Sequence, residues 1–94
     1  MLLVEVTGGW YKVYPNPTKD ILVIEIEKDK LNKEIRTQEI EIFLYDKLMM
    51  LQKHSKFKGL QFTINVNDLK PDIYILQLKI DNKVYEEKII ISHK

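Results

Sequence analysis

The fold class follows from one stretch, residues 62–80, which has the sequence FTINVNDLKPDIYILQLKI. Its first part predicts a strand with one buried face, because apolar residues alternate with polar ones at Phe62, Ile64 and Val66. Its last part, residues 73–80, alternates in the same way and places four side chains on one face: Tyr74, Leu76, Leu78 and Ile80. The segment between them is rich in Asn, Asp and Pro, which indicates a turn with Leu69 as its apolar anchor.

The same alternation predicts five more strands along the chain: residues 11–14, 21–27, 39–45, 49–53 and 84–92. Two of them have clear inward faces, formed by Leu22, Ile24 and Ile26 and by Ile40, Ile42 and Leu44. Residues 46–48 are expected to form a turn, and the charged segments 28–38 and 54–59 to form loops. About seven short strands separated by turns predict an all-β fold, an antiparallel two-sheet sandwich of the immunoglobulin-like kind.

Length and composition limit the class of protein further. The 94 residues are 45% apolar and 31% charged, which suits one small globular domain rather than a disordered tail. A net charge of +1 gives no basic surface for a nucleic-acid backbone, so no nucleic-acid partner is expected. Cysteine is absent, which excludes disulfides and thiolate chemistry. No stretch is long and apolar enough for a signal peptide or a membrane span.

Residues with catalytic potential are few, and we expect no enzyme, no metal and no cofactor. His54 and Ser55 are neighbours in a predicted loop, and such neighbours rarely form a nucleophile–base pair. His93 lies one residue from the end, where side chains are usually solvated. A calcium site is the least implausible metal hypothesis, with oxygens from Asn65, Asn67, Asp68 and Asp72, but these residues are also ordinary turn formers.

Two aromatic positions have alternative interpretations. Phe57 lies among basic residues, so that the segment is either a solvated loop or a weak patch for an anionic surface; these residues are Lys53, His54, Lys56 and Lys58. Trp10 and Tyr11 either cover the core or form an exposed contact, and a cover is expected where the first strand begins.

From residue 13 onward the chain resembles a known family, the C-terminal sorting domain of the type IX (Por) secretion system. Four motifs occur in the expected order: VYPNPT at residues 13–18, IFLYD at 42–46, INVNDL at 64–69 followed by IYILQL at 73–78, and DNK at 81–83 followed by KIII at 88–91. The family usually has glycine where this chain has Met49 and Asp72. If Met49 requires a positive φ, the substitution costs about 1 kcal/mol or more.

The resemblance implies recognition rather than catalysis. It implies a C-terminal secretion signal that outer-membrane translocon components recognise, attached to an upstream cargo of a longer precursor that is secreted or held at the outer-membrane surface. A sortase-like peptidase would cut before the domain, and we expect that cut in Thr7, Gly8 and Gly9. Residues 1–9 are then a linker or the remnant of an upstream segment, and residues 10–94 form the sorting-like domain.

The resemblance also suggests which residues form the sorting motif: Pro15, Asn16, Pro17, Asp46, Leu69, Tyr74, Lys88, Ile89, Ile90, Ile91 and Lys94. Purely structural roles are the alternative for the prolines and the isoleucines. The alternative function is a generic immunoglobulin-like adhesion or ligand-binding module, because a sandwich fold alone does not determine function.

Overall fold

The computed structural model describes residues 4–7, 11–26, 39–80 and 83–92. Every regular element within these ranges is a β-strand. The described residues contain no helix long and apolar enough to cross a membrane. The strands are β1 (Val4–Thr7), β2 (Tyr11–Asn16), β3 (Ile21–Ile26), β4 (Ile40–Tyr45), β5 (Leu51–Phe57), β6 (Gln61–Asn65), β7 (Asp72–Ile80) and β8 (Lys83–Ile91).

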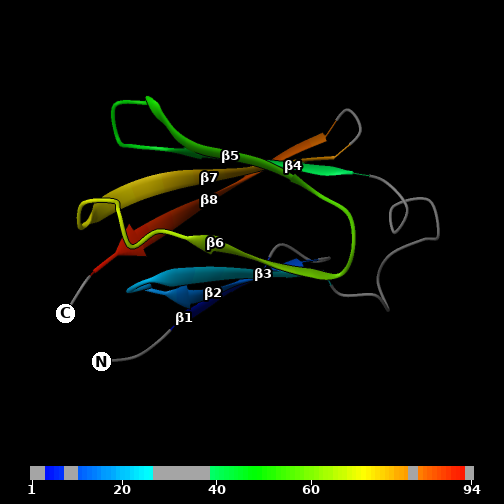
Figure 1. The fold of residues 1–94 in the computed structure, drawn as a ribbon, viewed down its shortest axis with the longest axis horizontal. Coiled ribbons are helices and arrows are strands. Elements are labelled where there is room, and N and C mark those ends of the chain that lie inside the picture. Colours follow the sequence, from blue (N-terminus) through cyan, green and yellow to red (C-terminus); the bar gives the residue numbers. More distant parts are fainter. Residues whose placement is uncertain (1–3, 8–10, 27–38, 81–82, 93–94) are drawn as a thin grey trace.

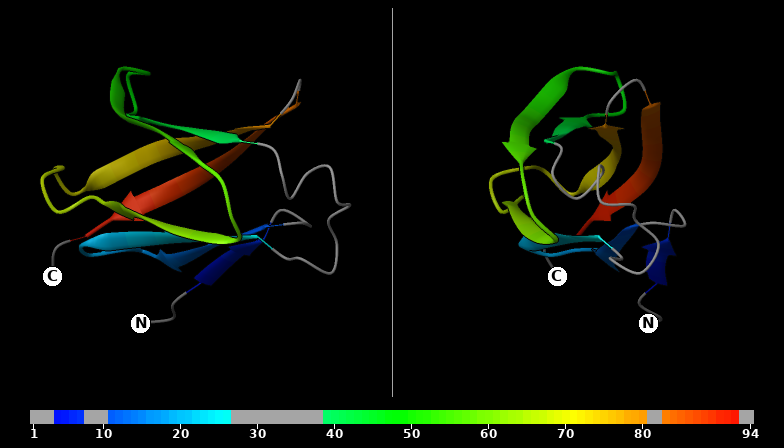
Figure 2. Two further views of the ribbon diagram at one scale, coloured as in Figure 1. Left: turned by 45° about the vertical axis from the view of Figure 1, so that its right-hand side comes forward. Right: turned by 90° about the vertical axis from the view of Figure 1, so that its right-hand side faces the viewer.

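These strands form two four-stranded sheets packed face to face (Figures 1 and 2). One sheet has the order β1-β2-β3-β6 and the other has the order β5-β4-β7-β8. All neighbours within the sheets are antiparallel. The predicted fold class, an all-β antiparallel two-sheet sandwich, is therefore confirmed.

The core lies between the two sheets and consists of the alternating residues that the sequence indicated. The predicted inward faces are all buried: Leu22, Ile24, Ile26, Ile40, Ile42, Leu44, Phe62, Ile64, Val66, Tyr74, Leu76, Leu78 and Ile80. On β8, Ile89 and Ile91 are buried whereas Ile90 is exposed, as period two requires. Tyr11 is buried as well, in agreement with its expected role as a cover of the core.

One loop prediction was wrong. Residues 54–59 were expected to be a loop, but β5 continues to Phe57 and pairs along its length with β4. Its polar side chains lie on an edge strand, where lysine is common because it discourages pairing with another chain. Phe57 stacks on Phe62 with ring centroids 4.0 Å apart, so this aromatic ring packs against the core instead of standing free for a ligand.

An eighth strand lies in the segment predicted to be a linker. β1 pairs with the outer edge of β2, and its register shifts between Val4 and Val6. The strand begins opposite Asn16 and ends opposite Lys12. The chain before Gly8 therefore adds an edge strand to the sandwich.

Candidate functional site

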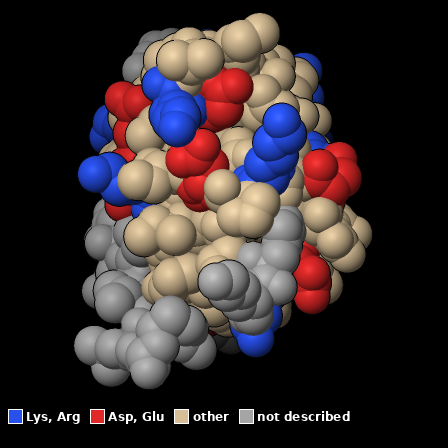
Figure 3. Space-filling model, turned by 90° about the vertical axis from the view of Figure 1, so that its left-hand side faces the viewer, with Lys and Arg blue, Asp and Glu red and all other residues tan. Residues whose placement is uncertain are grey.

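Four separate parts of the chain meet at one end of the sandwich, which lies at the left of Figure 1 and faces the viewer in Figure 3. Asp72 and Ile91 are opposite each other in the β7–β8 pairing. The amide of Val66 donates to the carbonyl of Asp20 at 2.8 Å, and Lys47 Nζ lies 3.1 Å from Asp72 Oδ2. We call this the motif end; it comprises residues 16–20, 46–50, 66–72 and 88–92.

Asn16 joins the first motif to the last one. Its Nδ2 donates to the carbonyl oxygen of Lys88 at 3.0 Å, and its Oδ1 accepts from the amide of Ile90 at 2.9 Å. Because β8 is an edge strand, these two main-chain groups have no partner strand on that side. The side-chain amide, which is itself buried, takes the place of a neighbouring strand at this point. The two prolines beside it, Pro15 and Pro17, both follow cis peptide bonds.

Thr18 extends the same contact. Its amide donates to the carbonyl of Ile90 at 2.9 Å, and its own carbonyl accepts from the amide of Ser92 at 2.8 Å. Its hydroxyl donates to the carbonyl of Ile21, which holds the turn between β2 and β3. Asn16 and Thr18 together fix the last described residues of the chain against the other sheet.

Asp46 organises the hairpin between β4 and β5. Its Oδ1 accepts from the amides of Leu48 and Met50, both at 2.9 Å, and its Oδ2 accepts from Gln52 Nε2 at 3.0 Å. Its main-chain carbonyl also accepts from the amide of Met49 at 2.9 Å. An aspartate at the first position of a turn forms such bonds because its short side chain reaches the amides that follow.

Met49 occupies the left-handed region with a φ of 64°. This is the conformation for which the family's glycine is suited, and a side chain there costs about 1 kcal/mol or more. Asp72 is not among the described residues with positive φ, so its replacement of glycine carries no such cost. The hairpin keeps a large apolar residue at its one strained position.

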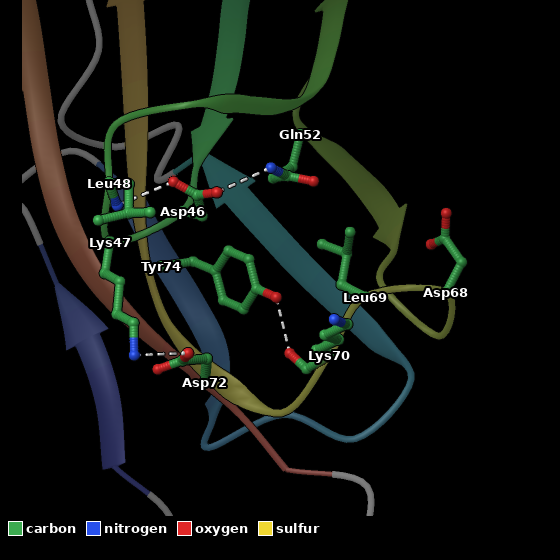
Figure 4. A pocket seen from close by; sticks show the side chains of 9 residues that line it. All are labelled: Asp46, Lys47, Leu48, Gln52, Asp68, Leu69, Lys70, Asp72 and Tyr74. Carbon is green, nitrogen blue, oxygen red and sulfur yellow. Dashed lines mark hydrogen bonds and ion pairs between the residues drawn. The ribbon is translucent and has the colours of Figure 1, made fainter.

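A hollow of about 340 Å³ opens between this hairpin and the turn before β7 (Figure 4). Asp46, Leu69 and Tyr74, which come from two different motifs, all line it. Tyr74 lies across its floor and donates to the carbonyl of Lys70 at 2.7 Å. Burial, followed by the nearby carboxylates of Asp72 and Asp46, raises the pKa of Tyr74, so the phenol stays protonated near neutral pH.

Ion pairs brace the rim of the hollow. Lys53 Nζ lies 2.8 Å from Asp68 Oδ2, and this hydrogen bond holds the pKa of Asp68 below its ordinary value. The pKa of Asp72 is also lowered, first by the hydrogen bond from the Ile73 amide and then by Lys47. Both carboxylates are solvent-exposed, so these ion pairs position the side chains of the rim but add little to the free energy of unfolding.

Of the two histidines considered for catalysis, only His54 lies within the described residues. His54 lies in β5, where its Nε2 is 2.6 Å from Glu41 Oε2 and its ring stacks on Phe43 at 4.6 Å between centroids. This is a cross-strand contact on a sheet surface. Within the described ranges no group of three histidine or carboxylate residues could hold a metal ion. His93 and Trp10 lie outside the described residues.

The comparison with protein families agrees with the arrangement of the motifs. A family model described as a secretion system C-terminal sorting domain matches residues 12–92. The chain belongs to this family. A search of curated proteins found no match.

Most of the predicted sorting-motif residues lie at the motif end. Two groups form at the motif end: Asn16 with Lys88–Ile91, and Asp46 with Leu69 and Tyr74 around the hollow. Pro15 and Pro17 flank the Asn16 contact. Thr7 ends β1, whereas Gly8, Gly9 and Lys94 lie outside the described residues.

Sequence reasoning missed several residues that build this end of the sorting domain. Thr18 is buried, and a threonine directly after a proline turn is the signal that could have found it. Gln52 and Lys47 act only through long side chains that cross to other segments, and no spacing rule identifies such contacts. The exposed apolar hairpin at Leu48–Leu51 was visible in the sequence but was taken as turn and strand.

Proposed function

We propose that this sorting domain acts as a folded address, and that the motif end is the surface the secretion machinery recognises. The family assigns the chain to secretion, so the cargo is secreted or surface-exposed as part of a longer precursor. The finer steps are the ones proposed here: recognition by outer-membrane components, cleavage, and release or attachment of the cargo.

One observation carries this proposal. Motif residues that are more than 70 positions apart in sequence, Asn16 and Ile90, are in direct hydrogen-bond contact. The remaining motif residues Asp46, Leu69 and Tyr74 line one hollow at the same end. Contacts between motifs also arise from folding alone, whereas a hollow that is open to solvent and lined by residues of two motifs offers a surface that a partner can reach.

We propose that a sortase-like peptidase cuts within residues 7–9. Thr7 pairs with Lys12 at the end of β1, so a cut after it separates β1 from β2 in sequence but not in space. Two successive glycines allow an extended backbone to enter a protease cleft. The cargo is the covalently linked upstream part of the precursor.

The proposal is tested by fusing residues 1–94 behind a reporter that is exported to the periplasm. Surface delivery is measured in cells with and without a type IX secretion system, and the reporter without the domain serves as the control. We expect delivery only when both the domain and the secretion system are present. Equal delivery in the two strains would refute the proposal.

The alternative, a ligand-binding module, would use the hollow. Its polar groups are already engaged within the chain, since Asp46 binds the hairpin and Asp68 and Asp72 face lysines. Few donors or acceptors therefore remain for a small ligand, and saturable binding of a glycan by residues 1–94 would be needed to favour this alternative.

A further inference from the structure

The β4–β5 hairpin ends in four consecutive apolar residues that the core does not use. They are half or more exposed: Leu48 by 75%, Met49 by 53%, Met50 by 62% and Leu51 by 52%. We call them the hairpin tip. The hairpin projects beyond the packed sheets in Figures 1 and 2, and the face above the motif end in Figure 3 is mostly uncharged there. An exposed cluster of this size on a small domain indicates a binding surface.

The conformation of the tip is fixed rather than incidental. The side chain of Asp46 binds the amides of Leu48 and Met50, so the turn is held before any partner arrives. Met49 keeps its φ of 64° although glycine suits this conformation better. Met49 therefore places an apolar side chain at a strained and exposed position where the family usually has glycine, and strain of this kind concentrates at functional sites.

A lipid surface is a poor partner for the tip. Membrane-binding hairpins rely on an excess of Lys and Arg beside the apolar residues. Here three lysines and three aspartates surround the hairpin and the hollow: Lys47, Lys53, Lys70, Asp46, Asp68 and Asp72. Two of these lysines are already paired with aspartates, so the tip carries no net attraction for anionic headgroups.

A second copy of the chain is a poor partner as well. The tip consists of four residues. Two tips packed against each other would bring together far fewer than the roughly 20–30 residues a side of a specific, stable interface. A convex hairpin gains more contact by entering a cavity, because the cavity surrounds its side chains.

We propose that the hairpin tip inserts into an apolar pocket of the protein that recognises this domain, with both charge signs at the rim of the pocket. Met49 and Met50 suit such a contact because the flexible thioether adapts to irregular cavities. Two ion pairs beside the tip would face the rim of that pocket: Lys47–Asp72 and Lys53–Asp68. Such pairs favour a rim that carries both positive and negative groups. This inference rests on the proposed secretion function and names the surface through which it works.

The test uses the reporter fused to residues 1–94 and the double variant Leu48→Gln, Met50→Gln. Both positions are exposed turn sites, so the melting temperature of the isolated domain is expected to stay unchanged. Surface delivery is expected to fall at least about tenfold, as when apolar anchors are removed from an interface. The matched control is Val84→Thr, because Val84 is 51% exposed but lies in β8 opposite Lys79, away from the motif end.

The outcomes separate this inference from the proposed function. The inference is supported if the parent and Val84→Thr fusions reach the surface and the double variant does not. Equal delivery of all three overturns it and leaves the secretion function standing, whereas failure of the parent fusion removes both. Leu48→Gln alone gives a second measurement if the double variant melts early, because this single exposed change should leave the melting temperature unchanged and still reduce delivery.

Two further results would also overturn the inference. One is tip-dependent binding of residues 1–94 to phosphatidylethanolamine–phosphatidylglycerol vesicles in flotation. The other is a tip-dependent dimer in sedimentation equilibrium. Each would assign the tip to a different partner.

Discussion

Replacing Asn16 with alanine removes the contact that joins the first motif to the last strand. Two hydrogen bonds are lost, at 3.0 Å to the Lys88 carbonyl and at 2.9 Å from the Ile90 amide. Each lost bond costs about 1 kcal/mol net, and more where the main-chain group left behind stays shielded from water. We therefore expect a loss of about 2–4 kcal/mol in the free energy of unfolding. For a domain of this size this corresponds to a melting temperature lower by about 10–20 °C.

The assay is urea unfolding of residues 1–94 followed by circular dichroism, together with hydrogen exchange at the Ile90 amide. Exchange at Ile90 should accelerate in Asn16→Ala, because this amide, on the outer edge of β8, loses the side-chain oxygen of Asn16 as its acceptor. The control is Asn67→Ala, an exposed asparagine in the turn after β6, which should change stability by less than about 0.5 kcal/mol.

The variant Asn16→Asp separates the two hydrogen bonds, because it keeps the acceptor and loses the donor. The carboxylate still accepts from Ile90, but it cannot donate to the Lys88 carbonyl and instead places a negative charge beside it. Only the protonated acid can donate, so the pKa of this aspartate should be raised by folding. The deficit relative to the parent should then be largest at neutral pH, shrink as pH falls toward about 4, the pKa of aspartate in the unfolded chain, and stay constant below it. If Asn16→Asp is as stable as the parent at pH 7, the reasoning about this contact fails.

Three further predictions concern single residues. Met49→Gly should stabilise the domain by about 0.5–1 kcal/mol in urea unfolding, and any destabilisation would show that the φ of Met49 is not a cost. Asp46→Ala should destabilise the hairpin by about 1–2 kcal/mol, whereas Asp46→Asn, which keeps an acceptor oxygen, should retain most of the stability. The pKa of Tyr11 is raised by burial and by its bond to Glu87, so stability present below pH 10 should fall as pH rises further; Tyr11→Phe should reduce this alkaline loss in thermal melts, while Tyr74, whose pKa is also raised, keeps a part of it.

The strands and their buried faces could be predicted from the sequence because period two is a local signal. Residues such as Leu22, Ile42 and Leu76 each alternate with polar neighbours, and burial on one face leaves few other solutions. The second half of β5, residues 54–57, was predicted as a loop because an edge strand that contains His54, Ser55 and Lys56 has the composition of a loop. Only its pairing with β4, a contact set by the tertiary structure, distinguishes the two.

The motifs suggested Asn16, Asp46 and Tyr74 as site residues, but the geometry around them could not be predicted. Nothing in the sequence indicates that Asn16 binds the main chain of β8. That contact joins residues 72 positions apart and depends on how the two sheets pack. The tip was missed for a different reason, since apolar residues after a turn normally predict a buried strand and only the structure leaves them exposed.

The contact of Asn16 with β8 also makes the proposed address conditional on folding. The last strand has no partner on its outer side apart from Asn16 and Thr18 in the part of the chain that the structure describes. In an unfolded chain the four motif segments are far apart, so no single segment presents the surface that a partner would recognise. Recognition of the motif end would therefore select domains whose two sheets have already packed. A peptide of residues 83–94 alone should accordingly fail to compete with the folded domain for surface delivery, however many motif residues it contains.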